Sequence, residues 1–251
     1  LEFRGMIANV GVRVEQLDPR HHAYNLQDRY NKNYDYNRFG DSFPIRWPEM
    51  TKPEGSEVRW KVSPRIGISH PVTENSKVYF NYGHFYQKPF TRRLFTTQAR
   101  SAAWGYPIIV SNVNIDWPRT VAYELGYDHN LMDVLLLHVA GYYKDNTQEL
   151  GPMDSYSYTN AIRITNYINN EYSDTRGLEL RVDKRWGRFF TFWANYNYMV
   201  RSAGTVGIAV WYEDILKSRD EDRNVSIRAR EQRSFARPNA RFNVNLHTPY
   251  R

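Results

Sequence analysis

Few side chains in this sequence of 251 residues have the types and spacing that could do chemistry. Four carboxylates stand four residues apart in two pairs: Glu124 with Asp128, and Glu179 with Asp183. Paired carboxylates can act as general acid and base, but these share a predicted face with Arg65 and Arg181. A face that carries both charges is typical of a solvated lining. We therefore expect no catalytic residues and no enzyme.

Motifs for cofactors and metals are also missing from the sequence. It contains no Gly-rich phosphate loop, no His-Glu-x-x-His pair and no Gly-x-Ser-x-Gly elbow. Since there is no cysteine, thiol nucleophiles, disulfides and Cys-based zinc sites are excluded. His21 and His22 are adjacent and point in divergent directions, and the surrounding segment supplies no further metal ligand. We expect neither a cofactor nor a metal.

One segment, 89–117, mixes cationic and aromatic residues and holds the candidate ligand-binding residues Arg92, Arg93, Trp104, Tyr106 and Trp117. Such groups can hold an anionic or ring-bearing ligand, and packing within a loop is the alternative for each. The same mixture occurs on surfaces for single-stranded nucleic acid. However, aromatic residues on the apolar face of the predicted strands argue against that, and the net charge of +7 is spread along the chain. We expect no nucleic-acid partner.

β-Strands must position these residues, because apolar residues recur at every second position in long stretches of the chain. In one stretch, Val58, Trp60 and Val62 lie on one side and Arg59 and Lys61 on the other. Eight stretches show this pattern: 6–15, 57–69, 78–87, 121–128, 134–143, 177–183, 190–199 and 241–247.

The connections between these stretches alternate in length. Three are of hairpin length, about two to five residues. The other four are long: 16–56, 89–117, 148–172 and 203–238. A meander of this kind has all its tight turns at one end, as outer-membrane barrels do with short periplasmic turns and long extracellular loops.

The apolar face favours a membrane-spanning barrel over a soluble β-sandwich. No ionised residue lies in the middle of that face, where Lys or Arg would cost roughly 2 to 4 kcal/mol in a bilayer. Amphipathic rings suit the two membrane interfaces, and five are candidates for these aromatic girdles: Trp60, Tyr86, Tyr123, Tyr127 and Tyr198. A mean hydropathy of −0.72 and the lack of an apolar run of about 18 residues exclude a transmembrane helix. The predicted fold is an all-β, antiparallel transmembrane β-barrel, in part.

Five short segments on the predicted strands carry a family signal. They are Val-Ser-Pro-Arg-Ile-Gly-Ile-Ser at 62–69, Val-Tyr-Phe-Asn-Tyr-Gly-His-Phe-Tyr-Gln at 78–87, Tyr-Glu-Leu-Gly-Tyr at 123–127, Tyr-Tyr-Lys-Asp at 142–145 and Thr-Arg-Gly-Leu-Glu-Leu at 175–180. In this order and spacing they resemble the C-terminal part of the barrel of TonB-dependent outer-membrane receptors. The resemblance covers most of the strands and none of the long connections.

This resemblance implies a receptor of the bacterial outer membrane that takes up a scarce ligand, such as a siderophore, vitamin, sugar or peptide, at extracellular loops. It implies contact with outer-membrane lipid and, through a plug domain, with a TonB-type inner-membrane energy transducer. Such barrels have roughly 22 strands, so we expect residues 1–251 to be a fragment of one barrel domain, with the plug and closing strand not present. The alternatives are a complete eight-stranded outer-membrane barrel with a structural or adhesive role, and a soluble β-sandwich binding module.

Overall fold

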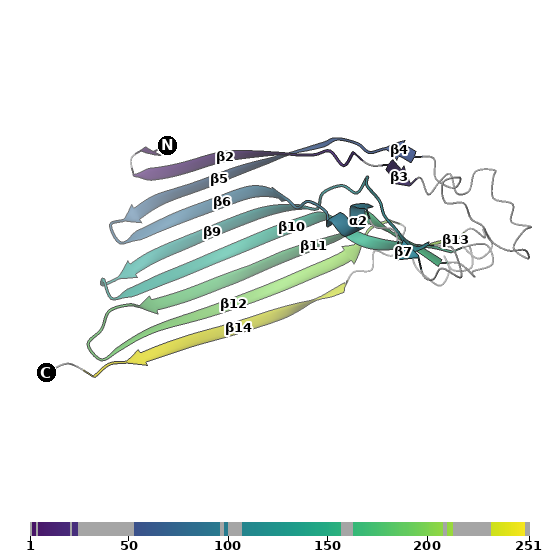
Figure 1. The fold of residues 1–251 in the computed structure, drawn as a ribbon. Helices are drawn as coiled ribbons and strands as arrows, with labels where there is room; N and C mark the ends of the chain where they lie inside the picture. The colour runs from purple at the N-terminus through teal and green to yellow at the C-terminus, as the bar shows by residue number, and fades with distance from the viewer. Residues whose placement is uncertain are drawn as a thin grey trace, which may run out of the picture.

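The computed structural model describes residues 2–3, 5–20, 22–24, 53–95, 98–99, 107–156, 163–207, 210–212 and 232–248. Its eight long strands are β2 (Met6–Leu17), β5 (Arg59–Thr73), β6 (Ser76–Tyr86), β9 (Arg119–Leu131), β10 (Leu135–Tyr156), β11 (Arg163–Lys184), β12 (Phe190–Thr205) and β14 (Gln232–Leu246). They lie side by side in that order in one sheet, each antiparallel to the next (Figure 1). The predicted all-β antiparallel meander of eight strands is confirmed.

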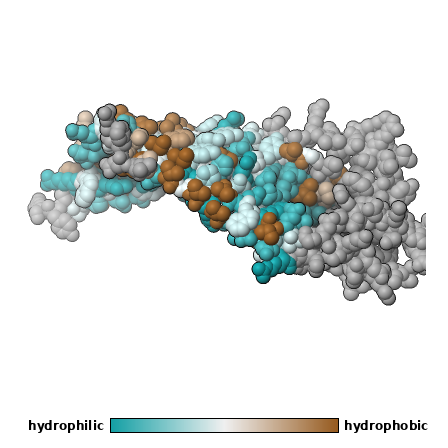
Figure 2. Space-filling model, turned by 90° about the horizontal axis from the view of Figure 1, so that it is seen from above, coloured by the Kyte–Doolittle hydropathy of each residue, from teal (hydrophilic) through white to brown (hydrophobic). Residues whose placement is uncertain are grey.

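The register of the strands produces two faces of different character. Ile68 lies opposite Phe80, which in turn lies opposite Leu125, so apolar residues of neighbouring strands share one side. We call this side the outer face and the opposite, polar side the inner face. Side chains of the outer face are exposed, with Val10 at 69% and Leu125 at 59%. Figure 2 shows hydrophobic side chains at the surface of the described residues, among hydrophilic ones.

The arrangement rules out the β-sandwich alternative for the described residues. All the long strands belong to a single sheet, and the other sheet among the described residues is the short pair β3 (His22–Tyr24) and β4 (Pro53–Gly55). A sandwich core needs a second sheet packed on the apolar face, whereas no sheet among the described residues packs on the outer face. The sheet is also open, because β2 and its short partner β1 (Glu2–Phe3) do not pair with β14 at the other edge (Figure 1).

The short turns lie together at one end of the sheet (Figure 1). Residues 74–75 join β5 to β6, 132–134 join β9 to β10, and 185–189 join β11 to β12. In the second turn, Met132 and Asp133 both have positive φ, and the Val134 amide donates to the Leu131 carbonyl. Two consecutive residues with positive φ match the twist of the flanking strands in a tight hairpin.

The prediction of a loop at 148–172 is wrong for most of that segment. β10 and β11 are 22 residues each and remain paired as far as Tyr156 opposite Arg163. Bulges near Asn146, Glu149 and Gly151 break the period of two, so the alternation that marks a strand disappears from the sequence while the pairing continues. We call the part of this hairpin beyond Asn146 and Ser173 the hairpin extension.

Short elements in the other long connections add to this end of the sheet. β8 (Pro107–Val110) runs parallel to β11 and pairs with β7 (Gln98–Ala99), while β13 (Val210–Tyr212) runs parallel to β10. A short helix, α2 (Thr91–Phe95), lies in the same region (Figure 1). The buried apolar core among the described residues is mostly found here: Leu94, Val113, Ile115 and Trp117, with Val121 and Ala140 on the adjoining strands.

Two tyrosines on the inner face lie across glycines of the neighbouring strand. Tyr79 is directly opposite Gly126, and Tyr142 is directly opposite Gly177. A Cβ added at either glycine would overlap the facing tyrosine ring. Because glycine has no side chain, each ring can lie flat over the neighbouring backbone, which is how aromatic residues compensate for glycine in a sheet.

Candidate functional site

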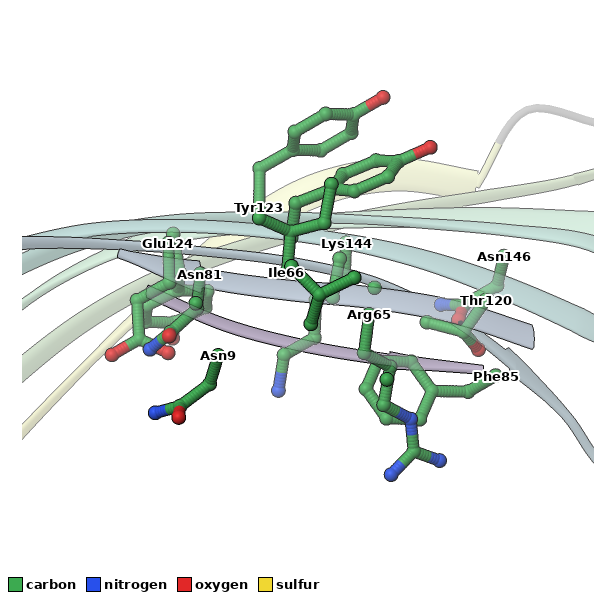
Figure 3. Close-up of a pocket in the computed structure, with 17 residues that line it drawn as sticks. Asn9, Arg65, Ile66, Asn81, Phe85, Thr120, Tyr123, Glu124, Lys144 and Asn146 are labelled. Carbon is green, nitrogen blue, oxygen red and sulfur yellow. Dashed lines mark hydrogen bonds between the residues drawn. The ribbon is translucent and has the colours of Figure 1, made fainter. Parts of the chain in front are cut away.

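A hollow of about 940 Å³ lies on the sheet at strands β2, β5, β6, β9 and β10. Figure 3 shows polar side chains of these strands, among them Asn9, Asn81 and Glu124, projecting to one side of the sheet, and the ring of Tyr123 projecting to the other. This follows from the alternation of each strand, which places polar residues at every second position on the inner face.

The hollow contains charges of both signs and aromatic rings. The Arg65 guanidinium lies 4.5 Å from the centre of the Phe85 ring. The Tyr79 hydroxyl donates a hydrogen bond of 2.7 Å to Glu124. Lys144 and Arg65 supply positive charge at the opposite side of the lining from Glu124 (Figure 3). Side chains of this kind can bind a polar molecule or a polar protein surface by hydrogen bonds and ion pairs.

The four carboxylates considered above as acids or bases each have a partner on the inner face. Besides the bond from Tyr79 to Glu124, Asp128 contacts His138 Nδ1 at 2.5 Å and Lys77 Nζ at 3.2 Å. Arg181 donates two hydrogen bonds to Asp183, of 2.7 and 3.0 Å, and Asn195 donates to Glu179 at 3.0 Å. Side chains fixed in this way line and rigidify the inner face, as expected for a charged lining.

The second site lies where the long connections meet the sheet. We call α2 and residues 111–118 the loop layer, since they pack together across the inner side of the strands. The Asn112 amide donates to the Arg93 carbonyl. Residues 111–117 alternate like a strand, and the side chains of Val113, Ile115 and Trp117 are 3%, 1% and 0% exposed. The loop layer is therefore a packed structure.

Asp116 joins this layer to two strands of the sheet. Lys61 Nζ on β5 lies 2.6 Å from its carboxylate. Asn169 on β11 accepts from the Asp116 amide at 2.8 Å and donates to the Asp116 carbonyl at 2.9 Å. Burial alone would raise the pKa of Asp116, but hydrogen bonds from Lys61 and from the Trp117 amide outweigh it and lower that pKa. The carboxylate is thus held ionised at neutral pH.

The candidate ligand-binding residues fall into three groups. The Arg93 guanidinium stacks 3.5 Å from the centre of the Tyr167 ring, and Arg92 is exposed on α2. Trp117 is fully buried, with the Lys88 ammonium 5.5 Å from its ring. Trp104 and Tyr106 lie outside the described residues. The structure thus brings Arg93 and Trp117 into one layer; of the three candidates that it describes, the two arginines reach the surface and Trp117 does not.

Three residues that join the loop layer to the strands were not among the site residues predicted from the sequence. Lys61, Asp116 and Asn169 come from segments more than 50 residues apart, and no local spacing connects them. The available signal was the set of asparagines at 166, 169 and 170, since an asparagine amide can both donate and accept hydrogen bonds.

Among the described residues, no three His, Asp or Glu side chains gather to hold a metal ion. The same part of the chain contains no helix that is long and apolar enough to span a membrane.

Comparison with known proteins gives a family match over nearly the whole chain. A family described as "TonB dependent receptor-like, beta-barrel" matches residues 6–250. No curated protein matches the chain.

Several solved structures are similar to the chain. The FrpB iron transporter of Neisseria meningitidis, in its F5-1 variant apoprotein form, is 13% identical with a TM-score of 0.48, over 82% of this chain and 29% of that one. The siderophore receptor PirA from Pseudomonas aeruginosa is 18% identical with a TM-score of 0.44, over 58% and 30%. A double mutant of the Serratia marcescens hemophore receptor HasR, in complex with HasA and heme, is 12% identical with a TM-score of 0.48, over 81% and 37%. The chain thus spans about a third of the length of these proteins.

Proposed function

Because the chain belongs to the TonB-dependent receptor β-barrel family, we propose that it forms about eight strands of an outer-membrane barrel that takes up a scarce extracellular ligand. The family consists of transport receptors and not of enzymes. On this proposal residues 1–251 are a fragment of one barrel domain, and the plug and the closing strand lie elsewhere in the protein. The apolar outer face contacts lipid, and the inner face lines the barrel.

The observation that carries the proposal is the pairing of an exposed apolar face with a charged inner face on strands whose short turns share one end. A soluble protein rarely exposes an apolar surface of this size, whereas a barrel in lipid requires it. On the outer face the rings of Tyr82, Tyr123 and Tyr143 form a row, with centres 5.1 and 6.4 Å apart. A row of tyrosines across three strands supports an aromatic girdle at a membrane interface.

The other girdle candidates fit this role to different degrees. Trp60, Tyr127 and Tyr198 are exposed on the outer face, at 61%, 36% and 42%. Tyr86 is half-buried, and the Lys61 ammonium lies 5.3 Å from its ring. Tyr86 therefore lies beside the lysine that pairs with Asp116 of the loop layer, and it fits a girdle less well than the three exposed residues.

We propose that ligand binds on the side of the long connections, where Arg92, Arg93, Trp104 and Tyr106 supply cationic and aromatic groups. Trp117 is buried and does not reach this site; its role is to pack the core of the loop layer, to which α2 belongs. The chemistry suits an anionic or ring-bearing ligand, and siderophore, vitamin, sugar and peptide all remain within the class that the family implies. Energy reaches the barrel from a TonB-type inner-membrane protein through the plug.

The first experiment is fractionation of cells that produce the native protein, followed by its intact mass after detergent extraction. We expect the protein in the outer-membrane fraction with a mass several times the 29.8 kDa of this chain. Recovery of the protein in a soluble fraction without detergent would contradict the barrel proposal. A mass near 29.8 kDa would replace it with the complete eight-stranded barrel of structural or adhesive role.

Uptake needs its own test once the ligand is found by screening anionic and ring-bearing nutrients. Arg92→Ala and Arg93→Ala should each weaken ligand binding about tenfold, which corresponds to about 1.4 kcal/mol. Arg188→Ala is the matched control, because Arg188 is an exposed arginine beside an aromatic ring at the short-turn end. Equal effects of all three substitutions would exclude a ligand site on α2.

A further inference from the structure

The hairpin extension contains a bulge that gathers oxygen atoms on one side. Pairing steps from Glu149 opposite Glu171 to Gly151 opposite Ile168, so β11 has one more residue than β10 between these pairs. A bulge re-aims side chains, and here the consecutive residues Asn170 and Glu171 both reach the space above Gly151. Glu171 Oε1 lies 2.8 Å from the position that a Cβ on Gly151 would take, and Asn170 Oδ1 lies closer still.

Asn170 is a buried amide with nothing to bind. It is 4% exposed, and neither Oδ1 nor Nδ2 has a hydrogen-bond partner. Its neighbour Asn169 is less buried and yet makes three hydrogen bonds, to the amide and carbonyl of Asp116 and to the carbonyl of Gln148. Buried polar groups almost always form hydrogen bonds, so the side-chain amide of Asn170, which forms none within the described residues, indicates a binding partner.

The charge around this amide is negative and unbalanced. Glu149 lies directly opposite Glu171, and like charges directly opposite each other destabilise a sheet. Within the described residues, neither carboxylate forms an ion pair or a hydrogen bond, although both are partly buried. On the other side of β11, Thr205 lies opposite Glu171 and can add a hydroxyl oxygen. The pairing thus places two carboxylates, an amide and a hydroxyl on adjoining positions of three neighbouring strands.

We propose that this bulge binds a calcium ion through Glu149, Asn170, Glu171 and Thr205. All four residues offer oxygen, which hard divalent cations require, and two carboxylates match a charge of +2. Calcium accepts six to eight oxygens in irregular geometry, whereas magnesium requires a near-octahedral set. The proposal goes beyond the uptake function, since it does not depend on which ligand is taken up or on whether any is.

The ion would cross-link three strands at the base of the hairpin extension. Glu149 belongs to β10, Asn170 and Glu171 to β11, and Thr205 to β12. The adjacent Asn169 holds Asp116 of the loop layer, so an ordered bulge also positions that layer. Calcium binding should therefore stabilise the surface on which α2 lies.

The test uses the full-length receptor in detergent, stripped with a chelator and titrated with calcium chloride by calorimetry. Hydrogen exchange of the amides at 149–156 and 163–171 is followed in parallel. We expect saturable binding and at least tenfold slower exchange in this segment with calcium, and a much smaller effect of magnesium. Glu171→Gln and Glu149→Gln should each weaken calcium binding at least tenfold.

Asp174→Asn is the matched control. Asp174 lies directly opposite Asp145 on the same two strands, so it is also in a like-charge pair, but it is not at the bulge. Its substitution should leave calcium binding unchanged. In metal-free protein, Glu171→Gln should slow exchange because it removes repulsion, and in calcium it should be faster than wild type, so the ranking reverses.

Three outcomes would overturn the proposal. The first is wild-type protein that neither binds calcium nor changes its exchange with calcium. The second is binding that Glu171→Gln and Glu149→Gln leave intact. The third is exchange that, after correction for the intrinsic rate at each pH, becomes slower on acidification but not with calcium, which would show that the two glutamates share a proton in place of an ion.

Discussion

Near the short turns, most strands direct apolar side chains outward and polar ones inward, whereas near the long connections both sides of β10 and β11 carry polar side chains. In the first region the outer face exposes residues such as Leu125 and Leu178, and the carboxylates of the inner face have local partners. In the second, the buried residues include Asn166, Asn170 and Ser173. Alternation in the sequence therefore indicates that the two faces of a strand meet different surroundings, and a strand without alternation can still be paired in the sheet.

The two regions are also stabilised differently. Near the short turns, the sheet is stabilised by the hydrogen bonds between its strands, and its apolar outer face is exposed. The stability of this region therefore depends on what covers that face. The loop layer instead has a buried core centred on Trp117 and ties to the strands through Asp116. Substitutions in the two regions should therefore show up in different measurements.

The largest effect is expected from Trp117→Ala in the loop layer. Removing a fully buried indole costs about 3 to 5 kcal/mol, and because the layer is local, the loss should appear as faster hydrogen exchange at 111–118 and 91–95. The strands near the short turns should be unaffected. Trp186→Ala is the control, since Trp186 is 79% exposed in a short turn. If both substitutions act alike, Trp117 does not hold the layer.

The next effect is expected on the outer face. Leu125→Arg should lower the free energy of unfolding in phospholipid vesicles by about 2 to 4 kcal/mol, because it places a charge in the apolar band. Asn81→Arg, on the inner face of the adjoining strand β6, should change it by no more than about 0.5 kcal/mol. Equal tolerance of the two arginines would mean that the outer face does not meet lipid.

Gly126→Val tests the inner face of the same region. A Cβ at Gly126 overlaps the Tyr79 ring, so the ring must leave its place and its hydrogen bond to Glu124 is lost. Overpacking of this kind costs about 1 to 3 kcal/mol in the free energy of unfolding. Gly141→Val is the matched control, because nothing lies within 4 Å of a Cβ there. A neutral Gly126→Val would show that Tyr79 does not need the glycine.

How much the sequence predicts follows from the same comparison. Where one face is apolar, as in 57–69 and 121–128, the period of two locates the strands and assigns their faces. In 148–172 the bulges and the polar composition remove that period, although the backbone continues to pair as far as Tyr156 and Arg163. The pairing there is determined by main-chain hydrogen bonds, which no local pattern of side chains reports.

The candidate site shows a similar division. Composition pointed to 89–117, and the structure places Arg93 and Trp117 of that segment in one layer. That Trp117 would be buried and Arg92 exposed depends on contacts with strands far away in the sequence. Lys61 and Asp116 are 55 residues apart, so their ion pair exists only once the sheet has formed. Trp104 and Tyr106 stay predictions.

The smallest effect is expected for the ion pair between Lys61 and Asp116, which joins the loop layer to β5. The pKa of Asp116 is lowered in the folded protein from an ordinary value of 3.8, so its ionised form stabilises the layer above that pH, and this contribution is lost as pH falls through the lowered pKa. Asp116→Asn should cost the layer about 1 kcal/mol at neutral pH and remove most of its acid sensitivity. Hydrogen exchange at 111–118, corrected for the intrinsic rate at each pH, measures both, with the exposed turn variant Glu74→Gln as control. Because Trp117 packing does not titrate, acid sensitivity that survives in Asp116→Asn would place the titrating group elsewhere in the layer.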